Sequence, residues 1–211
     1  MSITEPPLKQ EILEAVQDMK NKGMSPHLVL DAGLSISALD SKLPHSGDGS
    51  MKFLWGSNRD NEKRASCSTS TRAPQWLLID TSDHGILPGS RDKNYSAQQA
   101  HLATNYPEFR EASPGEYVSA VMITAVETRE KLLPSRPWTK ARTKDGFGLG
   151  YRDYRVDLGG FGSRGLIVSD NHDEFAGRTL GLAALRKFPD GSKVSDDDEI
   201  IVKFGVVPLN P

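Results

Sequence analysis

Two loops of this sequence carry histidine next to carboxylates, and these residue types bind metal ions and transfer protons. The first loop holds Asp83 and His84, just after an apolar run. The second holds Asp170, His172 and Glu174, which fall on one side if the chain stays extended there. Imidazole nitrogens and carboxylate oxygens are ligands of zinc and of harder divalent cations. We therefore predict a divalent metal site from these five residues, provided that both loops reach the same end of a sheet.

The same loops also have a simpler interpretation. Charged side chains are common where a strand ends, and an aspartate in a turn often serves only local hydrogen bonds. Arg164 and Arg178 stand beside the second loop and could neutralise its carboxylates. A metal site and a solvated turn therefore stay open as alternatives.

The glycine-rich run from Gly160 to Gly165 matches the pattern G-x-G-x-x-G. In a dinucleotide-binding fold this pattern lies between a strand and a helix, whose N-terminus receives the phosphates. Here Leu166, Ile167 and Val168 follow, and this run favours a strand. We interpret the glycines as a turn between two strands rather than as a nucleotide site.

Composition excludes several classes of function. The net charge of the 211 residues is −2, which gives no electrostatic basis for binding nucleic acid. No apolar stretch is long enough to span a membrane, and the first seven residues lack the regions of a secretory signal. Cys67 is the only cysteine, which excludes an internal disulfide. We expect a cytoplasmic protein that binds neither nucleic acid nor membranes.

The N-terminal residues 1–43 predict a cap of short helices. Apolar residues up to Met19 recur at helical spacing, and Gly23 is a typical stop. Ser25-Pro26 predicts a second short helix that ends near Gly33, and Ser35 can cap a third. Residues 56–74 are polar and without periodicity, which predicts a mobile loop.

A buried strand and a long helix are expected to form the core. Trp76 to Asp80 is a continuous apolar run that ends in an aspartate, typical of a central strand. Ser113-Pro114-Gly115-Glu116 is a capping box, and it predicts a helix from Pro114 to Lys131 whose apolar stripe covers the sheet. A further helix is predicted from the Ser96-Ala97-Gln98-Gln99 pattern.

Three antiparallel strands are predicted near the C-terminal half, at residues 151–158, 165–169 and 179–188, and a last strand at residues 200–206. In the first of these, Asp157 alternates with apolar neighbours and is expected to face water. The chain is thus predicted to be one α+β domain, 1–211. Its twisted, mainly antiparallel sheet would have about six or seven strands packed on one long helix, with short N-terminal helices.

The order of these parts resembles an uncharacterised bacterial domain family of similar length. The resemblance rests on the helix that ends in Lys22-Gly23, the Trp76 to Asp80 strand, a helix after Ser113, and Leu180-Gly181-Leu182-Ala183. It implies an α+β fold, and it implies no activity.

Two hypotheses of function follow. The first is a non-enzymatic soluble binding module for a small molecule or a protein partner. The alternative is a small metal-dependent, hydrolase-like enzyme that uses the two histidine-containing loops. The residues leave open whether any reaction is catalysed, and the relative position of the two loops separates the hypotheses.

Overall fold

A computed structural model of the chain describes residues 10–42, 53–55, 72–134, 139–146, 154–162 and 165–189. The helices in these ranges are α1 (Gln10–Asn21), α2 (Ile36–Lys42), α4 (Tyr95–Asn105) and α5 (Pro114–Thr128). The predicted α+β class is confirmed. Among the described residues, no helix is long and apolar enough to cross a membrane.

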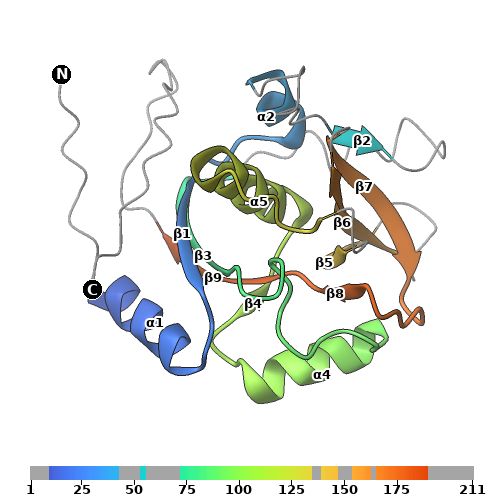
Figure 1. Cartoon of the computed structure of the whole chain (residues 1–211), viewed down its shortest axis with the longest axis horizontal. Coiled ribbons are helices and arrows are strands. Elements are labelled where there is room, and N and C mark those ends of the chain that lie inside the picture. Colours follow the sequence, from blue (N-terminus) through green and yellow to red (C-terminus); the bar gives the residue numbers. More distant parts are fainter. Residues whose placement is uncertain are drawn as a thin grey trace.

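The described strands form two sheets (Figure 1). The first is antiparallel and has the order β1 (Pro26–Asp31), β3 (Gln75–Asp80), β9 (Ala184–Pro189) and β4 (Arg110–Glu111). The second has the order β2 (Phe53–Trp55), β7 (Gly165–His172), β6 (Tyr154–Gly162), β5 (Lys140–Gly146) and β8 (Leu180–Leu182). It is mixed, because β2 runs parallel to β7 and β5 runs parallel to β8. The predicted single sheet of six or seven strands is therefore wrong.

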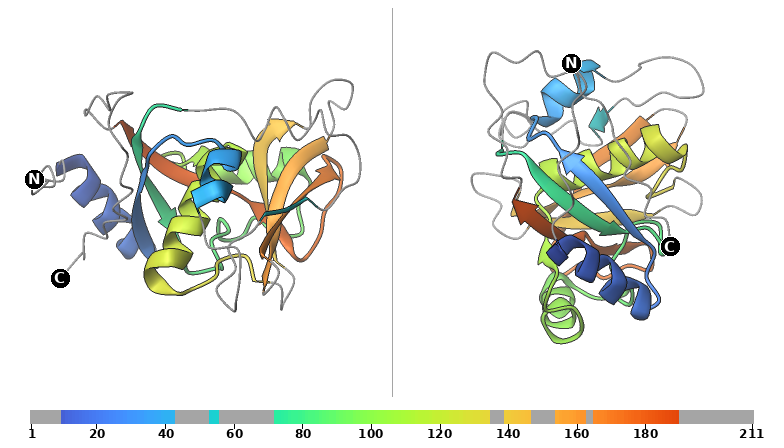
Figure 2. Two further views of the ribbon diagram at one scale, coloured as in Figure 1. Left: turned by 90° about the horizontal axis from the view of Figure 1, so that it is seen from above. Right: turned by 90° about the vertical axis from the view of Figure 1, so that its left-hand side faces the viewer.

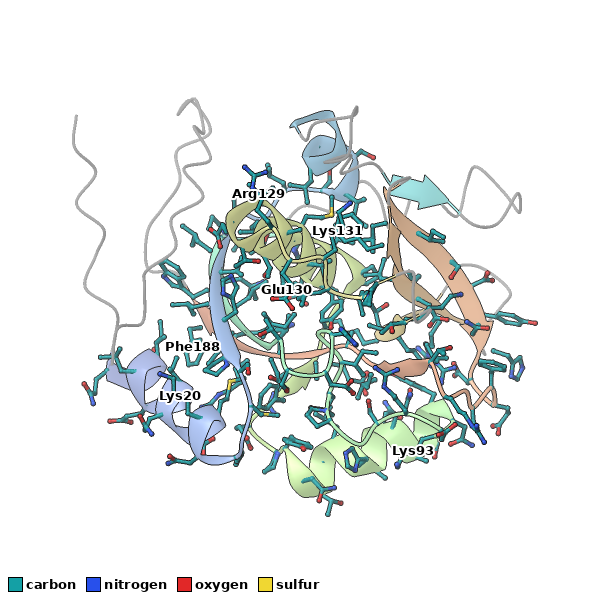
Figure 3. The ribbon with its side chains drawn as sticks, in the orientation of Figure 1. Lys20, Lys93, Arg129, Glu130, Lys131 and Phe188 are labelled. Carbon is teal, nitrogen blue, oxygen red and sulfur yellow. The ribbon has the colours of Figure 1, made fainter. Side chains whose placement is uncertain are left out.

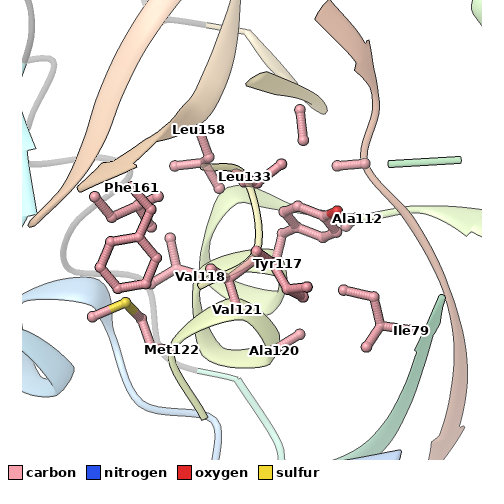
Figure 4. Packing of buried hydrophobic residues seen from close by; sticks show 14 of the residues in the cluster. Ile79, Ala112, Tyr117, Val118, Ala120, Val121, Met122, Leu133, Leu158 and Phe161 are labelled. Carbon is pink, nitrogen blue, oxygen red and sulfur yellow. The ribbon is translucent and has the colours of Figure 1, made fainter. Parts of the chain in front are cut away.

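Helix α5 packs against both sheets and forms the centre of the main core (Figures 1 and 4). Its start is fixed by the predicted capping box, in which Ser113 and Glu116 bond each other's backbone N–H, with Pro114 in the first turn. Every residue from Pro114 to Ala125 is buried. Val121 and Met122 are fully buried among residues of both sheets. Burying a side chain of this size contributes about 1.5–3 kcal/mol.

Helix α1 covers the opposite face of the first sheet, as the two views of Figure 2 show. Ile12 and Met19 lie on its buried side and pack in a second cluster with Leu78 and Phe188. Leu78 alternates along β3 with Leu77 and Ile79, which belong to the main core. The sheet is apolar on both faces, as a continuous apolar run such as β3 predicts.

One predicted helix is a strand. Residues 26–31 form β1, which pairs antiparallel with β3 over its whole length. Pro26 is the first residue of this edge strand, where a missing N–H is tolerated. Gly33 ends the segment with φ 76°, and its carbonyl accepts a hydrogen bond from Arg72 N. The expected helical cap over residues 1–43 therefore contains a strand between α1 and α2.

The predicted third strand is also corrected. The chain breaks at Ala183 into β8 in the second sheet and β9 in the first. β8 pairs with β5 rather than with β7. The backbone of Ala183 forms two hydrogen bonds. Its N–H donates to Arg142 O of β5 at 2.8 Å, and its carbonyl accepts from Ala112 N, next to β4, at 3.0 Å. This segment therefore joins the two sheets.

Two smaller differences concern helix ends. α4 begins at Tyr95, and Asn94 rather than Ser96 caps it, because the Asn94 side chain accepts from Ala97 N. α5 ends at Thr128, earlier than the predicted Lys131. Most of the predicted loop at 56–74 and the predicted last strand at 200–206 lie outside the described residues.

Candidate functional site

The connection between β3 and α4, which carries Asp83 and His84, meets the loop after β7 only near its own C-terminal end. The backbone hydrogen bonds run from Asp92 N to Gly177 O at 3.3 Å, and from N of Tyr95, the first residue of α4, to Asp173 O at 2.8 Å. These contacts come eight and eleven residues after His84, whose own carbonyl accepts a hydrogen bond from Leu133 N at 3.0 Å, so His84 lies beside a different segment.

Two of the three predicted carboxylates, however, already have partners. Asp83 is bound by Arg91, with an Nη2–Oδ1 distance of 2.9 Å. Glu174 accepts a hydrogen bond from the Asn94 amide at 3.1 Å. These side chains hold the loops in place, which is the role of a structural turn.

The remaining predicted ligands have different surroundings. His172 Nδ1 accepts a hydrogen bond from Glu174 N at 3.1 Å, and its ring lies edge-on to Tyr154, 5.1 Å between centroids. Asp170 is half-buried on β7, opposite Val156 of β6. His84 is exposed in a tight turn with φ 56°.

The five predicted ligands do not converge. Among the described residues, which include Asp83, His84, Asp170, His172 and Glu174, no group of three or more His, Cys, Asp or Glu side chains could hold a metal ion. The predicted metal site is therefore not assembled in the part of the chain that the structure describes.

A buried ion pair beneath the second loop was not foreseen from the sequence. Arg142 of β5 and Asp157 of β6 are both 0% exposed, and Arg142 Nε lies 3.8 Å from Asp157 Oδ1. Asn171 donates a hydrogen bond to the other oxygen of Asp157. Burial raises the pKa of Asp157 to about 6, and it outweighs the opposing effects of Asn171 and Arg142. The expectation that Asp157 faces water is therefore wrong.

Arg142 connects this pair to the loop above it. Its guanidinium donates to the carbonyls of His172 at 3.2 Å and Phe175 at 3.0 Å, and to Gln98 Oε1 of α4 at 3.3 Å. Burial lowers the pKa of Arg142. These contacts fix the loop after β7 onto α4. The pair is part of the scaffold.

Among the described residues, a groove beside α4 has the shape of a binding site. It has a volume of about 580 Å³ and lies between the C-terminal half of α4, the edge strand β4 and the neighbouring strands β5 and β9. The groove is lined by Gln99, Leu102, Ala103, Tyr106, Pro107, Phe109, Arg110, Glu111, Lys144 and Lys187. Pockets for small molecules typically measure about 300–1,000 Å³ and combine apolar walls with few polar groups.

The floor of the groove is formed by aromatic rings in edge contact. Phe109 is buried, and its ring stands edge-on to Tyr106 with centroids 5.9 Å apart. Tyr106 makes a second edge contact with His101 at 5.7 Å. Burial raises the pKa of the Tyr106 hydroxyl. Leu102 completes the apolar wall from α4.

Glu111 connects the groove to the second loop. Its carboxylate accepts a hydrogen bond from the Tyr95 hydroxyl at 2.6 Å, and the Arg155 guanidinium lies 4.3 Å from the centroid of the Tyr95 ring. Arg155 is in turn paired with Asp173 at 3.1 Å. This chain of contacts fixes the position of Glu111 on the wall of the groove.

No protein family, curated protein or solved structure matches this chain. The resemblance to an uncharacterised bacterial family thus stays a prediction, and the site must be interpreted from its own geometry.

Proposed function

We propose that the protein is a non-enzymatic binding module that holds a small ligand in the groove between α4 and β4. The observation that carries this proposal is the groove itself. Its volume of about 580 Å³ is the size of a small-molecule pocket. Its walls combine the rings of Tyr106 and Phe109 with charged groups at the rim.

The state of the histidine-containing loops supports binding over catalysis. A metal centre needs several ligating side chains that face one point, and no three His, Cys, Asp or Glu side chains of the described residues are placed in this way. Asp83 is bound by Arg91, and Glu174 accepts a hydrogen bond from Asn94. The hydrolase hypothesis therefore has no assembled group of residues to act through in the described part of the chain.

A ligand screen tests the proposal. Isotope-labelled protein is titrated with a library of small organic acids, alcohols and amines, and the backbone amide signals are followed by NMR. We expect binders to move the signals of residues 99–111 together with that of Lys144. Ala103→Trp should abolish these shifts, because Ala103 is exposed on α4 and lines the groove, so that an indole there fills it.

Ala100→Trp is the matched control. Ala100 is also exposed on α4, one turn before Ala103, and does not line the groove. It should bind like the wild-type protein. The proposal is wrong if binders shift signals elsewhere and leave the groove unchanged, or if both tryptophan variants bind equally well.

A further inference from the structure

The charges around the groove do not cancel. Lys187 is neutralised by Glu116, whose two oxygens both lie 2.8 Å from its Nζ. Arg110 and Lys144 are exposed cations on the rim, and Glu111 is the carboxylate among the lining residues. One positive charge is therefore left without a counter-charge among the described residues of this site.

The Arg110 guanidinium is held by two hydrogen bonds to the backbone. Its Nη1 donates to the carbonyls of Pro107 at 2.9 Å and Phe109 at 3.1 Å. These bonds tie the guanidinium to the backbone at the edge of the groove, and its other N–H groups have no partner among the described residues. In the described part of the chain Arg110 has no carboxylate partner, and neither has the Lys144 ammonium. A guanidinium fork held in this way matches the planar geometry of a carboxylate.

The acidic wall limits the charge of a ligand. Glu111 is held in place by the Tyr95 hydroxyl and cannot turn away without breaking that bond. A second negative charge on a ligand in the groove would approach this carboxylate, and like charges in a partly desolvated site repel.

From these contacts we propose that the ligand of the groove is an organic monoanion with an apolar body, bound by Arg110 and Lys144 through its carboxylate and by Leu102, Tyr106 and Phe109 through its hydrocarbon part. The inference rests on the proposed function, since it names the ligand class of the same groove. Buried apolar area supplies the attraction, and the cations supply the selectivity for one charge type.

Four ligands with the same chain length test the inference: octanoate, octan-1-ol, octylamine and the dianion octanedioate. Each is titrated into the labelled protein, and Kd is taken from the amide signals of the groove. Octanoate should bind roughly fivefold more tightly than octan-1-ol, which is the scale of an exposed charge interaction. Octylamine and octanedioate should bind more weakly than octanoate, and the preference for octanoate should shrink at high salt.

Substitutions test which residues cause the preference for octanoate. Arg110→Gln and Lys144→Gln should each weaken octanoate binding about threefold and leave octan-1-ol binding unchanged. Lys20→Gln is the control for net charge, because Lys20 is an exposed cation on α1 and does not line the groove (Figure 3). Its octanoate affinity should equal that of the wild-type protein.

The outcomes separate the two proposals. Equal groove binding of octanoate, octan-1-ol and octylamine, lost in Ala103→Trp, would overturn the monoanion inference and support the proposed function. A preference for octanoate that survives in the variant lacking both Arg110 and Lys144 would also overturn the inference. Absence of any groove binder from the wider library would overturn the proposed function itself.

Discussion

Glu116 offers a direct test of how the core helix is held in place. Its carboxylate accepts hydrogen bonds from Ser113 N and Ser113 Oγ at 2.8 Å, and both of its oxygens lie 2.8 Å from Lys187 Nζ. Gln75 adds a further bond at 3.1 Å. One side chain thus joins the first turn of α5 to β3 and β9. Glu116→Gln keeps the shape of this side chain and removes its charge.

The pKa of Glu116 sets the size of the effect. Burial alone would raise this pKa, but the bonds from Lys187 and Ser113 outweigh it, and the pKa falls from its usual 4.5 to about 2. A shift of this size corresponds to at most ~3 kcal/mol of stability. The Lys187 side chain is 24% exposed, so solvent weakens the pair. We expect Glu116→Gln to lose about 2 kcal/mol at pH 7, or roughly 4–8 °C in Tm.

The pH dependence identifies the cause. Because the pKa of Glu116 is lower in the folded than in the unfolded protein, its carboxylate stabilises the fold at any pH above the pKa of the unfolded state. This stability is lost as the pH falls through the pKa of the folded state. The difference between wild-type protein and Glu116→Gln, measured by urea unfolding, should be constant from pH 7 to pH 5 and shrink below about pH 4.5. Glu130→Gln, at an exposed position after α5, should show no difference. A Glu116→Gln loss that stays the same at pH 3 as at pH 7 would refute this account.

Three further predictions concern the core. Val121→Asp buries a carboxylate between α5 and the sheets, which costs several kcal/mol. We expect little soluble protein, and a variant that melts like the wild type would contradict the packing described above. Gly181→Ala places a methyl group against Ile86 and Ser90 Oγ and should lower Tm by several degrees in a thermal melt. Burial raises the pKa of Asp157 from its usual 3.8 to about 6, so the folded protein binds this proton more tightly than the unfolded chain does. The stability of the wild-type protein should therefore fall, by at most ~3 kcal/mol, as the pH rises between these two values. The stability of Asp157→Asn relative to wild type, from urea unfolding at pH 4 and pH 7, should therefore increase toward pH 7.

The parts of the fold that could be predicted from the sequence are those fixed by local signals. The capping box at Ser113 and the apolar run at residues 76–80 each correctly located an element. For residues 26–31 the local signals, a proline after a serine and a later glycine, predict a helix. The segment is a strand because it pairs with β3, and that pairing depends on residues far away in the chain. The division into two sheets depends on contacts between distant residues, such as Leu78 with Arg186, which no local pattern reports.

The candidate site was predicted less well for a related reason. Alternation placed Asp157 on the side of a strand that normally faces water, but the loop after β7 and α4 cover that side. The groove is built from α4, β4, β5 and β9, so its residues have no common spacing in the chain. The only local signal was the run from Tyr106 to Arg110, in which aromatic residues and a cation follow a helix.

The segment that joins the two sheets has a consequence for the order in which the chain can fold during synthesis. β9 lies between β3 and β4, yet it is made about a hundred residues after β3, roughly 5 to 20 s later at ordinary rates of translation. Until then the edge of β3 that will pair with β9 is open, and β5 lacks its partner β8. An open apolar edge is a site for pairing with other chains. The nascent protein therefore depends on completion of residues 180–189 to close both sheets at once, and chains that stop before them should be the ones that aggregate.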